Sequence, residues 1–343
     1  MKLKLLGDLT ARDFLRRYWQ KRPLFVRGAL PQFSGVVAAR ELFALAARND
    51  VESRIVERRA KRWETLQGPF ARISLKKSNA TLLVNGVNLH VPAADALLRR
   101  FHFIPQARLE DVMVSYATPG GGVGPHVDYY DVFLLQGPGR RAWRVAGRKY
   151  LAQPGDLLYL PPKVRHDGVA LEHCYTYSIG FRAPRGSELG AAFLDWLHER
   201  GLPEAEYRDP GLAPATRSGH IPGELIAFGN RLLKRIRWSC TEVEEFVGEY
   251  LSEPKPHVVF APGNSRRSLG QSLVRLDPKS RLFYRGKRFF INGESIEVEG
   301  RAAAWLRGLA DRRTAHGARL AGTRLAGLIS DWHERGYVNL EKG

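Results

Sequence analysis

The sequence contains little cysteine and no long hydrophobic run. Only two cysteines, Cys174 and Cys240, occur among its 343 residues, and they form no C-x-x-C pair, which excludes a zinc-finger or disulfide framework. No apolar run approaches the length of a membrane-spanning helix. The apolar stretch near the start ends at Gly7 and is too short for a signal-peptide core. We therefore expect a folded cytoplasmic protein that does not enter a membrane.

Negative charge is also scarce. The sequence has 54 Lys and Arg against 35 Asp and Glu, a formal net charge of +19. Cationic surface attracts phosphate without sequence preference, so this balance favours contact with RNA or a nucleoprotein. A generally basic protein complement in the source cell would explain it equally well, and no single run of cations decides between the two.

The apolar pattern predicts an α+β protein of three parts. In the first half, short strands rich in aromatic and β-branched residues are closed by Gly and Pro, which is typical of an antiparallel barrel. We predict this barrel, with helices before it, over 1–185. Amphipathic helices follow over 186–256, where Thr241 and Glu244 predict a capping box. Helices beside a small hairpin sheet predict a winged helix over 257–343.

Two segments of the barrel carry the side-chain types of a metal site. "PGGGVGPHVDYYDVF" (119–133) holds His126 and Asp128 two residues apart, and in extended backbone residues i and i+2 share a face. Such a pair alone is common by chance. "QPGDLLYLPPKVRHDG" (153–168) adds His166 in a G-x5-P-x4-H spacing after a predicted strand. Two imidazoles and one carboxylate form the facial triad of non-haem Fe(II) sites, and a zinc or manganese cupin is the alternative.

Three longer stretches carry a resemblance to a known family: "FLRRYWQKRPLFVRGALP" (14–31), "MVSYATPGGGVGPHVDYYDVFLLQGPGRRAWRV" (113–145) and "PGDLLYLPPKVRHDGVALEHCYTYSIGFRAP" (154–184). The chain resembles the JmjC-type bacterial ribosomal oxygenases over essentially its whole length. The resemblance implies a double-stranded β-helix barrel, a helical dimerisation segment and a winged helix, and hence a homodimer. It also implies an enzyme that uses Fe(II), 2-oxoglutarate and dioxygen to hydroxylate the β-carbon of an arginine. In this family the arginine lies in the sixteenth protein of the large ribosomal subunit.

The resemblance assigns roles to single residues. The iron ligands fall on His126, Asp128 and His166. The far carboxylate of 2-oxoglutarate is paired by Arg141, and Ser115 assists. A carboxylate left unpaired deep in a barrel is costly, whereas a guanidinium pairs it through two hydrogen bonds. The alternative for Arg141 is an ordinary surface arginine.

An arginine substrate calls for aromatic and acidic groups at the mouth of the barrel. Tyr129, Tyr130 and Asp131 directly follow the ligands and are the candidates, unless the tyrosines only pack and Asp131 caps a turn. The connection between Val145 and Pro154, "AGRKYLAQ", is much shorter than the acidic connection of the family. This difference leaves the exact target residue open.

Two rival functions stay open beside the oxygenase. One is a non-catalytic, basic ribosome-assembly factor, although the complete set of ligand types weighs against it. The other is a metal-dependent cupin that acts on a small molecule, although such an enzyme does not need the helical segment and the winged helix. The winged-helix hairpin is the expected contact for ribosomal RNA, and in a winged helix that docks only proteins its charges would be a solvated face. These charges are Arg281, Arg285, Lys287 and Arg288.

Overall fold

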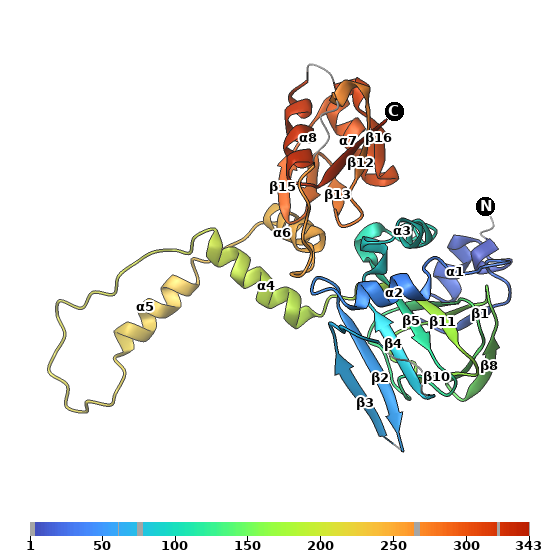
Figure 1. Ribbon diagram of the computed structural model, residues 1–343. Helices are drawn as coiled ribbons and strands as arrows, with labels where there is room; N and C mark the ends of the chain where they lie inside the picture. The colour runs from blue at the N-terminus through green and yellow to red at the C-terminus, as the bar shows by residue number, and fades with distance from the viewer. Residues whose placement is uncertain (1–3, 61, 74–77, 264–267, 321–322, 343) are drawn as a thin grey trace.

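The computed structural model describes residues 4–60, 62–73, 78–263, 268–320 and 323–342. The fold is α+β and consists of a barrel, a projecting helical arm and a winged helix that lies above the barrel in Figure 1. This architecture confirms the predicted fold class. None of the helices in these five ranges is long and apolar enough to cross a membrane.

The barrel is built from two antiparallel sheets that face each other. The larger sheet has the order β1-β9-β6-β11-β5-β4-β2-β3 and the smaller one β10-β7-β8. The strands are β1 Leu24–Val26, β2 Ser53–Arg59, β3 Arg62–Gln67, β4 Ala80–Val84, β5 Leu109–Ala117, β6 Val132–Gln136, β7 Arg141–Val145, β8 Arg148–Ala152, β9 Leu157–Leu160, β10 His166–Ala170 and β11 Cys174–Phe181.

The sequence of the central strand β6 is apolar without interruption because both faces of the strand are buried. Phe133 and Leu135 pack into the main core, which lies between the large sheet and the N-terminal helices. Val132 and Leu134 point the other way, into a second cluster that includes Trp143 of the small sheet. A strand buried on both faces needs no polar alternation. The space between the two sheets is therefore the place where a pocket can form.

Helices cover the outer face and one end of the large sheet. The helices are α1 Ala11–Arg17, α2 Ala39–Ala46 and α3 Pro92–Arg99, with short 3-10 turns at Lys4–Leu6, Val87–Leu89 and Gln106–Arg108. Thr10 caps α1 by accepting a hydrogen bond from the Asp13 amide. The buried ring of Phe14 on α1 meets that of Tyr159 on β9 edge to face, with ring centroids 4.9 Å apart. This contact fixes the N-terminal segment on the barrel.

The short connection noted in the sequence is a tight hairpin. β7 and β8 pair from Val145 with Arg148 to Arg141 with Ala152, and only two residues turn the chain. Those residues, Ala146 and Gly147, both have positive φ, at 45° and 82°, as a type I′ turn requires. The small sheet thus ends in a rigid turn with no loop of its own.

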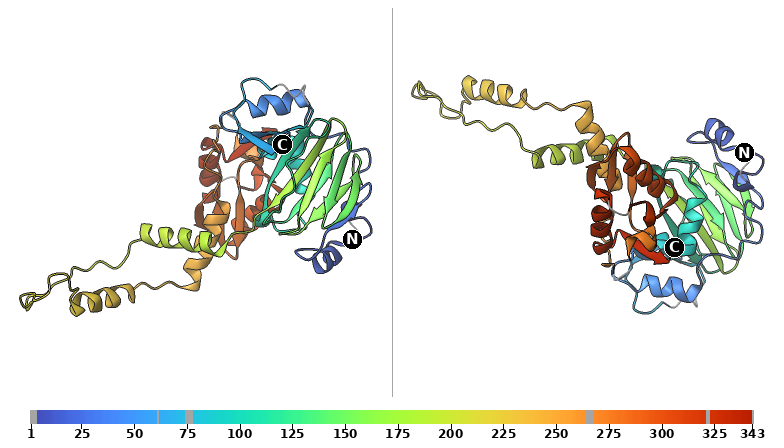
Figure 2. Two further views of the ribbon diagram at one scale, coloured as in Figure 1. Left: turned by 90° about the horizontal axis from the view of Figure 1, so that it is seen from below. Right: turned by 90° about the horizontal axis from the view of Figure 1, so that it is seen from above.

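The arm extends away from the barrel and the winged helix (Figures 1 and 2). It consists of α4 Gly186–Glu199, a segment without regular structure, and α5 Gly223–Leu233, after which α6 Cys240–Ser252 returns to the body. α6 begins two residues earlier than predicted. Its capping box is formed by Ser239 and Glu242, so the predicted box of Thr241 and Glu244 is wrong.

The winged helix has its own core and two three-stranded sheets, with orders β16-β12-β17 and β13-β14-β15. Its elements are β12 Ser272–Leu276, β13 Leu282–Arg285, β14 Arg288–Ile291, β15 Glu294–Glu297, α7 Gly300–Arg312, β16 Thr314–His316, α8 Arg324–Glu334 and β17 Val338–Lys342, with 3-10 turns at Leu269–Gln271 and Gly317–Leu320.

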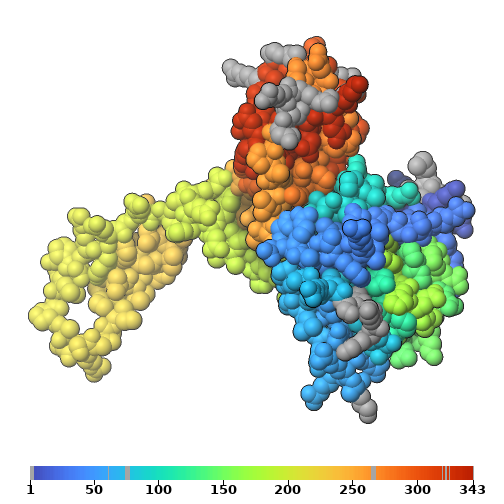
Figure 3. Space-filling view, in the orientation of Figure 1, coloured from blue at the N-terminus to red at the C-terminus, as the bar shows by residue number. Residues whose placement is uncertain are grey.

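The winged helix rests directly on the barrel, as the space-filling view shows (Figure 3). Gln106 of the barrel donates a hydrogen bond to the carbonyl of Ala310 on α7. Lys255, which follows α6, lies 2.9 Å from Glu110 and 3.2 Å from Asp111 at the start of β5. Polar contacts of this kind hold the winged helix and the segment after α6 at a defined place next to the open end of the barrel.

Candidate active site

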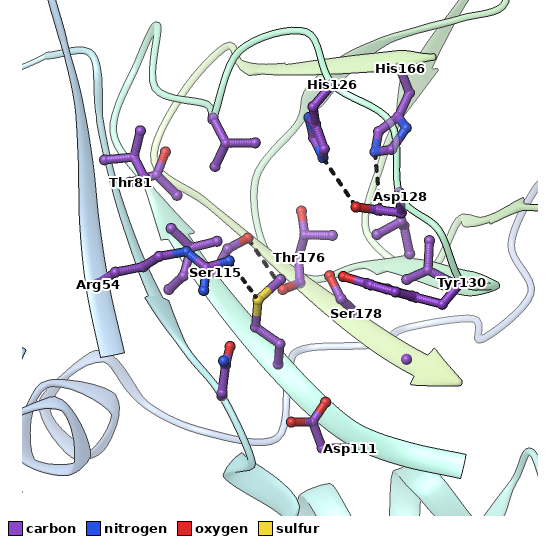
Figure 4. Close-up of a pocket in the computed structure, with 18 of the residues that line it drawn as sticks. Arg54, Thr81, Asp111, Ser115, His126, Asp128, Tyr130, His166, Thr176 and Ser178 are labelled. Carbon is purple, nitrogen blue, oxygen red and sulfur yellow. Dashed lines mark hydrogen bonds and ion pairs between the residues drawn. The ribbon is translucent and has the colours of Figure 1, made fainter. Parts of the chain in front are cut away.

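Three potential metal ligands converge at the open end of the barrel (Figure 4). His126 and Asp128 come from the loop between β5 and β6, and His166 begins β10. Nε2 of His126 lies 3.8 Å from Oδ1 of Asp128, and Nε2 of His166 lies 3.6 Å from Oδ2. All three ligand atoms lie within 4.8 Å of one another. The structure thus brings together the three residues that the sequence predicts as ligands.

The backbone explains how two distant segments meet there. His126 and His166 form an antiparallel bridge in which each amide donates to the other's carbonyl at 3.0 Å. The amide of Lys163 also donates to the carbonyl of Asp128 at 2.7 Å. The ligand loop is therefore attached to the small sheet at both ligands, and this attachment fixes where the three side chains point.

Each imidazole is oriented by a carbonyl group. Nδ1 of His126 lies 2.9 Å from the Gly124 carbonyl, and Nδ1 of His166 lies 2.9 Å from the Val164 carbonyl. Because a carbonyl only accepts, the proton of each neutral ring resides on Nδ1, and Nε2 is left with its lone pair toward Asp128. Burial lowers the pKa of His166 and favours this neutral form. Both rings are thus prepared to bind a metal.

The glycine-rich sequence before His126 has a steric cause. A Cβ on Gly124, whose φ is +80°, would lie 2.6 Å from Nε1 of Trp63, and a Cβ on Gly122 would lie 2.6 Å from the carbonyl oxygen of Gly168. The loop passes between the β3 indole and β10 with no room for side chains. Larger residues would push His126 away from Asp128.

A pocket of about 530 Å³ leads from the ligands into the space between the sheets. Arg141 lies in its wall and is only 5% exposed. Among the residues that the structure describes, neither Nε nor Nη2 of Arg141 has a hydrogen-bond partner. Buried guanidinium groups without partners are rare because the lost hydration is costly. These atoms therefore point to an anionic ligand that is part of the functional site.

The surroundings of Arg141 are polar on one side and aromatic on the other. The buried hydroxyl of Ser115 on β5 donates to the carbonyl of Thr176 at 3.4 Å, and both residues line the same pocket (Figure 4). The ring of Trp143 lies 5.7 Å from the guanidinium carbon of Arg141. A carboxylate that reaches Arg141 would thus meet a charged donor and hydroxyl groups in an otherwise apolar space.

Comparison with known proteins shows which family the chain belongs to. Residues 96–153 and 148–189 match the JmjC domain family, and the two segments meet at the β7–β8 hairpin. Residues 235–339 match the ROXA-like winged helix family. The chain is 35% identical over 325 residues to the ribosomal protein uL16 3-hydroxylase of Escherichia coli (strain K12), which covers 85% of this chain and 86% of that protein. The chain belongs to the JmjC-type ribosomal oxygenases.

Two further relatives agree with this membership. A probable ribosomal oxygenase of Haemophilus influenzae is 36% identical over 208 residues, which is 53% of this chain and 52% of that protein. The solved structure of YcfD, a ribosomal oxygenase from Escherichia coli, in complex with cobalt and 2-oxoglutarate matches with a TM-score of 0.83 at 31% identity. The match covers 97% of this chain and 98% of the YcfD chain. The predicted family, fold and oxygenase class are thereby confirmed.

The three predicted substrate residues of this ribosomal oxygenase lie in different places. Tyr130 lines the pocket, and burial, with a smaller contribution from the charge of Asp128, raises its pKa to about 12. Tyr129 is 58% exposed, and the guanidinium of Arg185 stacks over its ring at 5.1 Å. The two neighbouring tyrosines thus occupy the inner and outer parts of the mouth.

Asp131 does not lie at the mouth, contrary to its prediction as a substrate residue. Its side chain is fully buried, and it accepts hydrogen bonds from the Tyr159 hydroxyl at 2.6 Å and from Nε2 of Gln20 at 3.0 Å. Arg108 lies 3.7 Å away. The carboxylate holds the N-terminal segment on the barrel and has no contact left for a substrate.

The structure also adds pocket residues that the sequence did not reveal. Arg54 and Trp63 reach the pocket from the β2–β3 hairpin, and Met113 and Asp111 reach it from β5. No motif marks Arg54, Trp63 or Asp111, and Met113 opens the stretch quoted from 113 to 145 without a role assigned to it. They are found only when the hairpin, which is far from the ligands in the sequence, pairs with β4 and extends the large sheet over the mouth.

Proposed function

We propose that this ribosomal oxygenase is an Fe(II)- and 2-oxoglutarate-dependent hydroxylase that acts on the β-carbon of an arginine in a large-subunit ribosomal protein of the uL16 type. One observation carries the proposal: the two histidines and the aspartate share a pocket with a buried guanidinium that has no partner among the described residues. The name of the Escherichia coli relative supports the substrate, and the cobalt and 2-oxoglutarate complex of YcfD supports the cofactors.

His126, Asp128 and His166 are proposed to hold the iron. Two nitrogen ligands and one carboxylate suit Fe(II) and leave coordination positions for other ligands. When bound, Fe(II) with 2-oxoglutarate and dioxygen supplies oxidative decarboxylation to succinate and carbon dioxide, with transfer of one oxygen atom to a C–H bond. The chain contributes the orientation of both imidazoles through the carbonyls of Gly124 and Val164.

Arg141 is proposed to pair the far carboxylate of 2-oxoglutarate. Nε and Nη2 of a guanidinium lie on one edge in the geometry that a carboxylate accepts bidentately, and these are the two nitrogens without a partner. The hydroxyl of Ser115, which now makes only a long contact to Thr176, supplies a further donor. The co-substrate would thus be oriented from the end that does not react.

Tyr130 and Tyr129 are proposed to flank the target arginine. The phenol of Tyr130 stays neutral because its pKa is raised to about 12, so its ring offers a π face and its hydroxyl a hydrogen bond to a guanidinium. These groups can orient an arginine side chain so that its β-carbon faces the metal triad.

We further propose three units, 1–185, 186–256 and 257–343, and a homodimer formed by the arm. α5 has no buried residue, and Leu225, Ile226 and Leu233 along it are 39%, 53% and 66% exposed. A second copy of the chain would cover this surface. α6 also contacts the winged helix, because Glu245 accepts hydrogen bonds from Arg288 on β14 and Ser295 on β15. The boundary proposed between 256 and 257 therefore lies between two units that pack against each other.

Hydroxylation of a ribosomal protein peptide tests the proposal. We expect Fe(II)-dependent succinate formation and a mass increase of one oxygen atom on one arginine, and we expect both to be lost in His126→Ala. His198→Ala, at an exposed position on α4 outside the pocket, is the matched control. Succinate formation without peptide hydroxylation would reject the substrate. Absence of metal-dependent 2-oxoglutarate binding would reject the enzyme and favour the assembly factor.

A further inference from the structure

The four cations that the sequence offers for RNA contact are occupied within the protein. Each pairs with a carboxylate: Arg281 with Glu110 at 3.9 Å, Arg285 with Glu244 at 2.9 Å, Lys287 with Glu297 at 3.0 Å and Arg288 with Glu297 at 3.0 Å. Two of these pairs join the hairpin to other parts of the protein. The winged-helix hairpin therefore presents a balanced surface rather than a cationic one.

A different group of cations lies on the β7–β8 hairpin and on the segment before β10, next to the ligand loop, and we call it the rim cluster. It comprises Arg144, Arg148, Lys149, Lys163 and Arg165, all exposed. In the described parts of the chain, no carboxylate oxygen lies within 4.0 Å of a side-chain nitrogen of any of the five. Asp167 faces Arg144 in the β7–β10 register but does not reach it. The cluster is thus a concentration of free positive charge.

The backbone places these five residues together. Arg144 lies directly opposite Lys149 in the β7–β8 hairpin, whose turn brings Arg148 alongside. The amide of Ala146 in that turn donates to the carbonyl of Arg165 at 3.1 Å. Like charges directly opposite each other destabilise a strand pair. A tight hairpin that carries such a pair has an electrostatic cost with no compensating contact in the described structure, which favours a functional role.

The rim cluster adjoins the metal triad. Arg165 precedes His166, and the amide of Lys163 is bonded to the carbonyl of Asp128. A polyanion held by the cluster would therefore lie next to the ligand loop, close to where a substrate segment approaches the triad. A free arginine-rich peptide would meet repulsion at the same place, because like charges at this range repel even in water.

We propose that the rim cluster binds the phosphate backbone of RNA beside the substrate segment, so that the enzyme takes its target protein in RNA-bound form. The substrate part of this inference rests on the proposed function. The RNA part rests on free positive charge alone, because phosphates are attracted without sequence preference. RNA phosphates bound at the rim cluster would attract a basic substrate protein, which the cluster alone would repel.

Binding of a short fluorescein-labelled RNA hairpin, measured by anisotropy over a series of KCl concentrations, tests the RNA part. The variant Arg148→Ala/Lys149→Ala removes two rim charges, and Arg285→Ala/Lys287→Ala removes two ion-paired charges as the matched control. We expect the rim variant to lower the slope of log affinity against log salt by about 1.4 to 1.8. The control should keep the wild-type slope. Thermal unfolding of both variants confirms folding.

Turnover of a free basic peptide gives a second test, in which the rim variant should be improved and not weakened. The rim variant should use this peptide better, with kcat/KM about twofold higher for each charge removed at a distance of about 10 Å. Wild-type RNA binding in the rim variant, equal loss in the control, or affinity for poly-glutamate without affinity for RNA would each overturn the rim proposal. RNA binding without peptide hydroxylation would instead reject the proposed function and leave the rim intact.

Discussion

Replacing Arg141 with glutamine tests the assignment of the co-substrate site. The guanidinium is 5% exposed, and its Nε and Nη2 lack partners among the described residues. If these atoms bind the far carboxylate of 2-oxoglutarate, the substitution removes two charge-assisted hydrogen bonds and leaves one carboxylate without its cation. Hydrogen bonds to charged groups contribute about 1.5 to 3 kcal/mol each, and the glutamine amide recovers part of this.

A net loss of about 3 kcal/mol corresponds to an increase of roughly 150-fold in the KM for 2-oxoglutarate. Arg141→Lys keeps the charge but not the two-pronged geometry, so an intermediate KM is expected. The assay is succinate formation as a function of 2-oxoglutarate concentration at saturating Fe(II).

Thermal unfolding without 2-oxoglutarate is the control, because the same substitution that weakens co-substrate binding should not lower the stability of the free protein. Arg141→Gln removes a buried charge that lacks a counter-charge, so the melting temperature of the free protein should stay equal or rise. A KM within threefold of the wild-type value in a folded Arg141→Gln would refute the reasoning. A melting temperature that falls sharply would show instead that the guanidinium is a structural element.

Three further predictions concern stability and assembly. Lys255→Met should lower the free energy of unfolding by about 2 to 4 kcal/mol in denaturant titration, because it removes the cation that pairs with the buried Asp111, whereas Glu110 keeps Arg182. Lys234→Met, at an exposed position without an ion pair among the described residues, is the control, and an equal effect there would contradict the prediction. Burial, with the Arg313 charge, lowers the pKa of His102 to about 4. Its unfolded form binds protons first, so stability should fall as the pH drops from 6.5 to 4, and melting temperatures of His102→Gln should fall less over this range. Leu233→Asp, which alters the exposed arm, should convert a dimer into a monomer in light scattering, and an unchanged mass would refute the arm interface.

The sequence predicts that His126, Asp128 and His166 come together, because the determinants of this cluster are local. His126 and Asp128 are two residues apart in one loop, and His166 follows a Gly-Asp turn and a proline-terminated strand. Each piece of the pattern fixes backbone direction over a few residues. The spacing within each segment therefore survives folding, and only the pairing of the two segments had to be supplied by the barrel.

Arg141 shows what the local pattern leaves undecided. Arg140 and Arg141 are adjacent and chemically identical, and strand alternation separates them. Arg141 faces inward with Trp143, whereas Arg140 is exposed and pairs with Glu172. Resemblance selects Arg141, and its burial is visible only in the folded chain.

The two errors have different physical causes. Asp131 is held by Tyr159 and Gln20, which lie 28 and 111 residues away in the chain, so nothing near Asp131 predicts its burial. The capping box of α6 was misplaced because the pattern S/T-x-x-E occurs twice within three residues. Where two local solutions are equivalent, the path of the preceding chain decides between them.

The carbonyl contacts of His126 and His166 have a consequence for how the protein takes up and loses its metal. Because the imidazoles are oriented by the protein's own backbone, their conformational freedom is given up during folding and not during metal capture. The metal-free protein would then stay folded, and it could bind or release metal without a change in its barrel. Because binding is not coupled to folding, the fraction of active enzyme would follow the free metal concentration as a simple saturation curve. The extent of substrate modification would then depend on the metal concentration in the cell.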